Sequence, residues 1–232
     1  MLKAAVRKRR RGFTLAAELE VESGGALAVF GPSGAGKSTL LACLAGVETP
    51  DEGAISLGGQ PLFPAGPPLY RRPVGYLTQE PNLFPHLSVA RNVGFGLAGG
   101  GRGEADRAWL GELRARLQLE DCWQAPATAI SAGQARRVAL ARMLARRPTL
   151  VLLDEPFTGL DRALVRGLLQ DLLAWRETLG FTLLAVDHQA EVLERLAPRV
   201  LALDAGRAVA QGSWSELRAS ADAGLSGLLD PL

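Results

Sequence analysis

The chain has 232 residues, 47% of them hydrophobic, which is enough for one packed α/β domain with or without a subdomain. Its 26 basic and 24 acidic residues leave a formal net charge of +2, so bulk charge does not point to nucleic acid as a partner. No apolar run approaches the roughly 18 residues that cross a bilayer, and we expect a protein that is soluble or held at a membrane by a partner.

The opening of the chain, to about residue 60, is rich in strand patterns. Apolar and polar side chains alternate over residues 15–21, which is typical of a strand with one buried face, and residues 54–57 form another apolar segment before two glycines. We expect an antiparallel β layer here. The basic run at residues 7–11 is interpreted as a solvated stretch, with a contact to nucleic acid or anionic lipid as the less favoured alternative.

A complete phosphate-binding loop of the form G-x-x-x-x-G-K-[ST] occupies residues 31–39. It follows an apolar run at residues 26–30, which predicts a buried strand, and precedes an apolar run at residues 40–45, which predicts a helix. The glycines let backbone N–H groups converge on one centre, and the helix N-terminus adds its positive dipole there. This segment therefore predicts a nucleotide site.

Two side chains of this loop have separate expected roles. Lys37 reaches the β- and γ-phosphates, and the Ser38 hydroxyl ligates a magnesium ion that bridges the same groups. A glycine-rich turn without a ligand is the alternative, and Lys followed by Ser argues against it. The residues expected to bind the nucleotide are Gly31, Pro32, Ser33, Gly34, Ala35, Gly36, Lys37, Ser38 and Thr39.

The middle of the chain changes from loop to helix. Residues 60–72, rich in Pro and Gly, predict a loop, and residues 74–78 predict a short strand that ends at Gln79. Residues 87–129 have a helical pattern that a flexible glycine stretch at 99–101 interrupts. Its expected apolar face consists of Trp109, Leu110, Leu113, Leu117 and Leu119.

Strands and helices then alternate, which predicts a doubly wound parallel core without internal repeats. We expect an α/β fold with a P-loop NTPase core, a mostly parallel sheet, the N-terminal antiparallel layer and an inserted helical subdomain. Residues 1–232 form a single domain, in which 87–130 are the subdomain and 1–86 with 131–232 are the core. The expected elements are helices at 135–146, 162–179 and 189–196, strands at 149–153 and 181–186, and a hairpin at 200–210.

Residues 150–155 place four apolar side chains before two carboxylates, Asp154 and Glu155. A buried strand delivers both acids to its carboxyl end, which is the edge where open α/β sheets bind ligands. Successive side chains point in different directions, so we expect Asp154 to hold magnesium and Glu155 to act as general base on the attacking water. A simple helix N-cap is the alternative, which the phosphate loop makes the weaker interpretation.

Residues 130–134, Ile-Ser-Ala-Gly-Gln, resemble the signature segment of ATP-binding-cassette (ABC) ATPases, and Arg-Val-Ala-Leu-Ala-Arg follows at 137–142. Gln79 resembles the Q-loop glutamine of that family. Gly-Leu-Asp at 159–161 is similar to its D-loop, and His188 falls at its switch histidine. Order and spacing agree from the phosphate loop to His188, so the chain resembles the ABC ATPases, which bind ATP and Mg²⁺.

The resemblance implies an ATPase that works as a homodimer of head-to-tail subunits. Ser131 and Gly133 of one subunit close over the nucleotide held by the other, and the resemblance counts Gln134 and Asp161 among the nucleotide-binding residues. Gln79 touches magnesium or water and reports the nucleotide state to a membrane partner. His188 orients the γ-phosphate and the water, and the resemblance counts it with Glu155, Gln79 and Lys37 as catalytic.

Three positions depart from the family pattern. Ala132 replaces the first signature glycine, and we expect a weaker contact across the dimer if this position needs positive φ or close phosphate approach. Lys8 falls where the family places an aromatic ring against adenine. Phe13 is the nearest aromatic residue, and it either stacks on adenine or, as we favour, belongs to the core. Asp187 stands in place of the usual Ser or Thr before the switch histidine, with an open effect.

Residues 83–89, Leu-Phe-Pro-His-Leu-Ser-Val, resemble importers of molybdate, sulfate, ferric iron, thiamine, polyamines or maltose. Phe84 and Leu87 are candidates for the contact with an integral membrane permease, or equally for the subdomain core. The segments around residues 72–74 and 79–84 look most like thiamine-type subunits, followed by molybdate and iron types. We expect no additional regulatory domain after the ATPase. A periplasmic or lipid-anchored solute-binding protein is implied as an indirect partner.

The implied location is peripheral, on the cytoplasmic side of the inner membrane. Cys43 and Cys122 have neither metal-ligand nor disulfide spacing, which fits a reducing cytoplasm.

Two other classes of ATP-binding protein are alternatives. An ABC ATPase of DNA repair would need a coiled coil between Gln79 and Ser131, where no sustained heptads occur, and a P-loop kinase for a small metabolite would need an arginine-rich lid and no signature segment.

Overall fold

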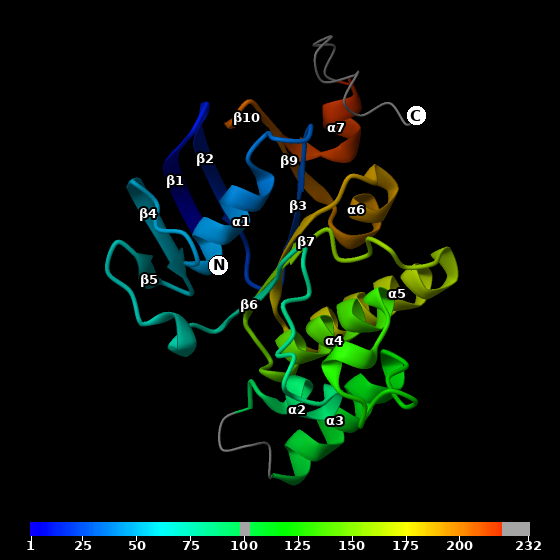
Figure 1. The fold of residues 1–232 in the computed structure, drawn as a ribbon. Coiled ribbons are helices and arrows are strands. Elements are labelled where there is room, and N and C mark those ends of the chain that lie inside the picture. Colours follow the sequence, from blue (N-terminus) through cyan, green and yellow to red (C-terminus); the bar gives the residue numbers. More distant parts are fainter. Residues whose placement is uncertain (98–102, 220–232) are drawn as a thin grey trace.

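The structure, a computed structural model, describes residues 1–97 and 103–219 (Figure 1). The glycine stretch at 99–101 lies outside the described residues. Within those residues, ten strands form one mixed sheet in the order β5-β4-β1-β2-β10-β9-β3-β8-β7-β6. The strands are β1 Leu2–Arg10, β2 Phe13–Val21, β3 Ala26–Phe30, β4 Glu52–Leu57, β5 Gln60–Phe63, β6 Val74–Leu77, β7 Leu150–Asp154, β8 Thr182–Val186, β9 Arg199–Asp204 and β10 Arg207–Ser213.

Helices cover both faces of the parallel part of the sheet (Figure 1). Short 3-10 helices occur at Leu69–Arg71 and Ala127–Ala129. Within the described ranges, every helix is too short or too polar for a bilayer crossing. The α-helices are α1 Lys37–Ala45, α2 Val89–Gly94, α3 Glu104–Arg116, α4 Ala132–Ala145, α5 Arg162–Leu179, α6 Ala190–Leu196 and α7 Trp214–Ala219.

The expected parallel core is confirmed. Strand β3 pairs in parallel with β8 and β9, and β7 pairs in parallel with β6 and β8. Along β7, Leu150 and Leu152 enter one buried cluster while Val151 and Leu153 enter the other. Such strands are apolar throughout because both of their faces are covered. Their carboxyl ends therefore meet at one edge, where the polar residues that follow them gather.

The expected antiparallel layer is also confirmed, and it contains two strands, β1 and β5, for which the sequence analysis named no segment. β1 pairs antiparallel with β2 and β4, and α1 lies between this layer and the parallel strands (Figure 1). The prediction of a loop from residue 60 is wrong at its start, because residues 60–63 form β5 against β4. Pro61 is tolerated there because β5 is an edge strand, and Leu62 is buried in the core.

The basic run at residues 7–11 is exposed apart from the partly buried Lys8, as expected of a solvated stretch, but its side chains also have partners. All but its last residue belong to β1, and their side chains meet acidic residues that precede or open β4. Lys8 pairs with Asp51 at 3.0 Å, and Arg10 pairs with Glu48. The run is thus matched locally by opposite charge, and exposed pairs of this kind contribute little to stability.

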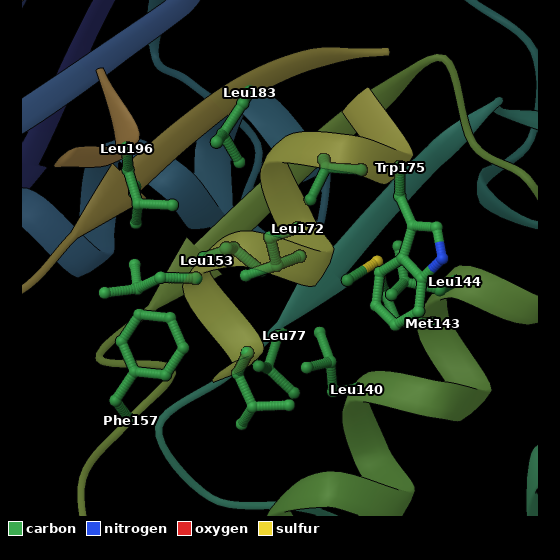
Figure 2. Close-up of a cluster of buried hydrophobic side chains, with 14 of the residues drawn as sticks. Leu77, Leu140, Met143, Leu144, Leu153, Phe157, Leu172, Trp175, Leu183 and Leu196 are labelled. Carbon is green, nitrogen blue, oxygen red and sulfur yellow. The ribbon is translucent and has the colours of Figure 1, made fainter. Parts of the chain in front are cut away.

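The second face of the parallel strands carries α4, α5 and α6, with α2 and α3 at the end shown at the bottom of Figure 1. Figure 2 shows part of this cluster, in which Met143 of α4 lies near Trp175 of α5 and Leu140 of α4 lies near Leu77 of β6. The predicted apolar face at 109–119 is buried there, except that Leu110 is only partly buried. Trp109 packs edge-on against Trp175, with ring centroids 5.8 Å apart.

Candidate active site

The phosphate loop joins the end of β3 to α1, as the sequence predicts. Gly31, Gly34 and Gly36 have φ of 153°, 79° and 99°, and Gly36 is the N-cap of α1. A Cβ on Gly31 would collide with the backbone carbonyl of Leu203 in β9, whereas one on Gly34 would meet open space. The loop therefore needs glycine both for its backbone path and for its close approach to the neighbouring strand.

Lys37 is the first residue of α1, and its ammonium group lies over the loop. Its Nζ donates to the carbonyl oxygens of Gly31 at 2.6 Å and Pro32 at 2.8 Å. Burial lowers the pKa of Lys37, while the nearby carboxylates of Glu155 and Asp154 act in the opposite direction. The side chain is thus a partly desolvated cation held at the mouth of the loop, where an anionic phosphate would compete for it.

Asp154 ends β7 and is 4% exposed. The Tyr76 hydroxyl donates to its Oδ2 at 3.4 Å, and the Ser38 hydroxyl forms a further hydrogen bond with this carboxylate. Burial raises the pKa of Asp154, and it also raises that of Tyr76 well above its ordinary value. The carboxylate is therefore aimed at the first turn of α1 and lacks the solvent that would stabilise its charge.

Glu155 follows in the left-handed region, with φ of 49°. Its N–H donates to the carbonyl of Val186 at 2.9 Å, so the turn is pinned to the end of β8. Gln79 Nε2 and Thr158 Oγ1 both donate to its Oε2, at 3.2 and 3.3 Å. The left-handed backbone of Glu155 and its two hydrogen-bond donors hold the side chain in one direction. That direction is away from Asp154 and toward the loop that follows β6.

His188 and Asp187 follow β8 at the same edge of the sheet. The His188 side chain is 62% exposed, and its Nδ1 lies 3.6 Å from Oδ1 of the buried Asp187. That Oδ1 accepts the backbone N–H of Gln189 at 3.0 Å. Burial raises the pKa of Asp187, against the effect of this hydrogen bond and of His188. The carboxylate at 187 therefore shapes the turn that carries His188.

The donors around Asp154 suit a magnesium ion that shares its ligands with phosphate. Ser38 contacts the Asp154 carboxylate. Gln79 donates through its amide nitrogen to Glu155, the residue next to Asp154, and it also offers an amide oxygen as a ligand. Magnesium prefers such oxygen donors and commonly takes one or two carboxylates together with substrate phosphates. Nowhere in residues 1–97 and 103–219 do three His, Cys, Asp or Glu side chains gather as a metal cluster. The residues fit an ion held partly by a bound nucleotide.

The signature residues lie at the start of α4, which begins at Ala132, earlier than the predicted residue 135. Ser131 and Gln134 form a reciprocal capping box, with hydrogen bonds of 3.2 and 2.9 Å, and this cap explains the earlier start. Gly133 faces Leu160 and Gly159 of the same chain. Ser131 and Ala132 are exposed, so this end of α4 is accessible to another molecule.

The structure also places Asp161 and Ala132, each at the start of a helix. Asp161 caps α5, with its Oδ1 accepting the N–H groups of Ala163 and Leu164 at 3.0 and 2.9 Å. Ala132 opens α4 and is not one of the residues with positive φ, so the concern about a left-handed backbone at this position does not apply. The Ala132 methyl group can therefore affect a contact with a partner only through its size.

Phe13 begins β2, is partly buried and packs against the core cluster that contains α1. Its ring also lies beside the phosphate loop, because a Cβ on Gly36 would be 3.2 Å from Phe13 Cε2. This placement agrees with the favoured core interpretation. Lys8, the position aligned with the family's aromatic ring, instead pairs with Asp51.

Phe84 and Leu87, the candidate permease contacts, lie in the loop after β6. Both are partly buried, and the Phe84 ring is 4.3 Å from the ring of Phe95, which is 62% exposed. Asn92 is buried and fixes this loop, accepting the Phe84 N–H at 2.8 Å and donating to its carbonyl at 3.1 Å. Phe84 and Phe95 line a groove of about 230 Å³ with Tyr76, Arg142 and Arg146.

Three residues at this site were missed by reasoning from the sequence. Tyr76 and Thr158 touch the two acids, and no pattern around them gave a signal. Arg136 is 3% exposed and donates to the backbone carbonyls of Gln79 and Glu155. It could have been found, since it shares the helical stripe of Ala139, Leu140 and Met143, where an apolar residue is expected.

A family model described as "ABC transporter" matches residues 16–158. The chain is 41% identical to the thiamine import ATP-binding protein ThiQ of Jannaschia sp. (strain CCS1), over 91% of this chain and 92% of that protein. It is 44% identical to the Fe(3+) ions import ATP-binding protein FbpC 1 of Rhodococcus jostii (strain RHA1), over 85% of this chain but 57% of that protein.

Solved structures have the same fold. The ATP-binding cassette MJ0796, described as dimeric, in a post-hydrolysis state and bound to ADP and Pi, superposes with a TM-score of 0.82 at 26% identity, covering 92% of this chain and 98% of that chain. CbiO1 from Clostridium perfringens, described as part of the ABC transporter complex cbiONQ, gives a TM-score of 0.77 at 27% identity, with 94% and 90% covered.

Proposed function

The chain belongs to the ABC transporter family, and from this premise we propose that it is the ATP-hydrolysing subunit that powers a membrane importer. One observation carries the proposal: the ends of the parallel strands of the mixed sheet gather the Lys37 ammonium group, the buried Asp154 and the Gln79–Glu155 hydrogen bond around the phosphate loop. This is the arrangement that binds and cleaves a nucleoside triphosphate.

In this proposal the loop at residues 31–39 holds ATP. Its N–H groups and the N-terminus of α1 cradle the phosphates, and Lys37 exchanges its two carbonyl partners for phosphate oxygens. Ser38, Asp154 and Gln79 would hold Mg²⁺. When bound, the ion supplies positive charge that stabilises the phosphate oxygens during cleavage.

Hydrolysis is assigned to Glu155 as general base. The hydrogen bonds from Gln79 and Thr158 both go to Oε2, so within residues 1–97 and 103–219 the other oxygen, Oε1, is left to accept a proton from water. His188 orients the water and the γ-phosphate, and its exposure leaves the ring able to reach a ligand. Asp187 fixes the turn below it.

We further propose that two copies enclose two ATP molecules. The capped N-terminus of α4, with Ser131, Gly133 and Gln134, would close on the phosphates held by the other copy, beside Asp161. The MJ0796 cassette, described as dimeric, supports this assignment. Residues 87–130 would act as the helical subdomain, and 1–86 with 131–232 as the core of one domain.

The proposed site of action is the cytoplasmic face of the inner membrane. The groove at Phe84 and Phe95 would receive an integral membrane permease, and a solute-binding protein outside would deliver the solute. The relatives described as thiamine and Fe(3+) import proteins support a small solute of the thiamine, molybdate or ferric iron type. Between Gln79 and Ser131 the described α-helices are α2 and α3, neither long enough for the coiled coil of a DNA-repair ATPase.

The test is Glu155→Gln. We expect ATP binding to persist, while turnover falls by about 10²–10⁴-fold because general base catalysis is lost. ATP should then trap a dimer, measured by size-exclusion chromatography with light scattering in ATP and Mg²⁺. Glu177→Gln, a change in an exposed carboxylate of α5, is the matched control and should hydrolyse ATP as the unaltered chain does. A Glu155→Gln variant that stays monomeric at high concentration contradicts the proposed dimer.

A further inference from the structure

Arg136 is a buried arginine on α4 that bridges two segments of the active site. Its Nη1 donates to the carbonyl oxygens of Thr78 at 2.6 Å and Gln79 at 2.5 Å. Its Nη2 donates to the carbonyl of Asp154 at 3.1 Å and to that of Glu155. Four N–H groups of one planar guanidinium therefore join the loop after β6 to the end of β7, in directions that the plane fixes.

The positive charge of Arg136 lies close to acidic residues of the active site. Burial lowers the pKa of Arg136, while the carboxylates of Asp154, Glu155 and Asp187 oppose this effect. A guanidinium remains protonated in proteins, so a cation lies beneath the acids at this edge of the sheet. An apolar side chain would satisfy the packing stripe of α4, but it would leave four carbonyls without this partner.

A second arginine of α4 holds the same loop farther along. Arg142 donates to the carbonyls of Pro81 at 2.9 Å and Asn82 at 2.8 Å, and its guanidinium lies 5.2 Å from the centre of the Phe84 ring. By contrast, Arg137 turns away from the site and donates to Leu117 and Gln118, both at 2.7 Å. The loop at 78–82 is thus fastened to α4 at both ends.

We propose that Arg136 is a positioning residue that transmits displacement of α4 to Gln79 and Glu155 of the same chain. The inference rests on the proposed function, in which the N-terminus of α4 contacts the ATP of the other copy. Because Ser131 and Arg136 lie on one helix, closure of the signature segment on one ATP sets the geometry of the catalytic residues at the other. Arg136 therefore couples the two ATP sites.

The experiment compares Arg136→Gln, Arg136→Lys and the matched control Arg137→Gln in steady-state ATP hydrolysis. For Arg136→Gln we expect kcat to fall by about tenfold or more, with KM changed by less than about threefold, because ATP binding does not use the bridge. Any positive cooperativity in ATP should disappear. Arg136→Lys keeps the charge but has one nitrogen, which cannot reach all four carbonyls, so it should not restore kcat. Arg137→Gln should keep the parent kcat and cooperativity.

Hydrogen exchange of the nucleotide-free protein separates this inference from the proposed dimer. Arg136→Gln and Arg136→Lys should speed amide exchange at residues 78–82 and 154–158, whereas Arg137→Gln should act at 117–119. If these changes occur while Glu155→Gln stays monomeric, the bridge stands and the dimer fails. Unchanged exchange, full activity of Arg136→Lys, or equal loss of kcat in Arg137→Gln overturns the inference. If Arg136→Gln does not fold, Arg136→Lys alone decides by the same measurements.

Discussion

Asp187 is one of the three positions where this chain departs from the family pattern, and its surroundings explain what the departure does. The carboxylate is 2% exposed, and it accepts the N–H of Gln189 while lying 3.6 Å from the His188 ring. It therefore closes the turn before α6, which a Ser or Thr hydroxyl could also do. The difference is that the aspartate brings a charge into a buried place.

That charge predicts a dependence of stability on pH. Burial raises the pKa of Asp187 above that of the unfolded chain, so the native state binds the proton more tightly. Stability contributed by the protonated form is present at low pH and falls as pH rises through the folded pKa. Asp187→Asn keeps the acceptor oxygen and lacks the charge, so it should raise the free energy of unfolding at pH 8 by about 1 kcal/mol.

Thermal unfolding from pH 4.5 to pH 8 measures this effect. The gain in Tm from Asp187→Asn should be largest at pH 8 and should shrink toward pH 4.5. Glu177→Asn, at an exposed position on α5, controls for the loss of a negative charge alone and should show no such trend. A gain that grows toward low pH, or a loss at pH 8, contradicts the burial argument.

At this scale the sequence predicted which residues meet at the site, but not how they are held. Lys37, Asp154 and Glu155 follow from motifs whose spacing leaves few arrangements, and the structure brings them to one sheet edge. The contact of Lys37 with two carbonyls depends on the loop's own path. Two partners of Arg136 lie 57 and 58 residues away and the other two lie 18 and 19 residues away, and no local pattern contains such contacts.

At the scale of elements, helices and central strands were predicted better than edges. Helix α5 occupies the predicted 162–179, because an N-cap at Asp161 and Gly180 at its end mark both limits. α4 was placed three residues too late, since its capping box coincides with the signature motif. Strand β5 was missed because Pro and Gly in its segment favour a loop, and only pairing with β4 makes it a strand.

The turn between β9 and β10 gives a prediction at this scale, because it packs against the phosphate loop. Gly206 has φ of 81° and donates to the Ala35 carbonyl at 3.1 Å. A Cβ there would lie 2.8 Å from Phe13 Cδ2 and would collide with the carbonyl of Thr14. Gly206→Ala should therefore lower the free energy of unfolding by about 3 kcal/mol, from backbone strain and overpacking together.

Gly58→Ala is the matched control, because Gly58 also has positive φ, 59°, but a Cβ there meets nothing within 4 Å. It should lose only about 1 kcal/mol, the cost of a left-handed alanine. Urea unfolding of both variants gives the comparison. Equal losses in the two variants would show that the contact with Phe13 and Thr14 is easily relieved.

For the whole molecule, the groove beside the loop after β6 predicts a separation of hydrolysis from transport. Phe84→Ala and Phe95→Ala remove its aromatic pair without touching the phosphate loop or the acids. The isolated variants should hydrolyse ATP within about threefold of the parent rate, since no group that stabilises the reaction is lost. With the permease in proteoliposomes, solute-stimulated ATPase activity should fall by about tenfold or more.

Val209→Ala controls for the loss of an exposed apolar side chain, because Val209 lies on β10, in the strand pair that follows α6. It should leave both isolated and permease-stimulated rates unchanged. If the aromatic variants are stimulated as fully as Val209→Ala, the permease binds elsewhere on the subunit.

The order of strands in the sheet also has a consequence for how the protein is made. Strand β3, which leads into the phosphate loop, is synthesised among the first 30 residues, yet both of its partners, β8 and β9, come after residue 181. At ribosomal rates of about 5–20 residues per second, β3 waits roughly 9 to 35 seconds for them. During that interval the apolar β3 lacks the strands that pair with it, and a half-made subunit lacks Glu155, the proposed general base for ATP hydrolysis.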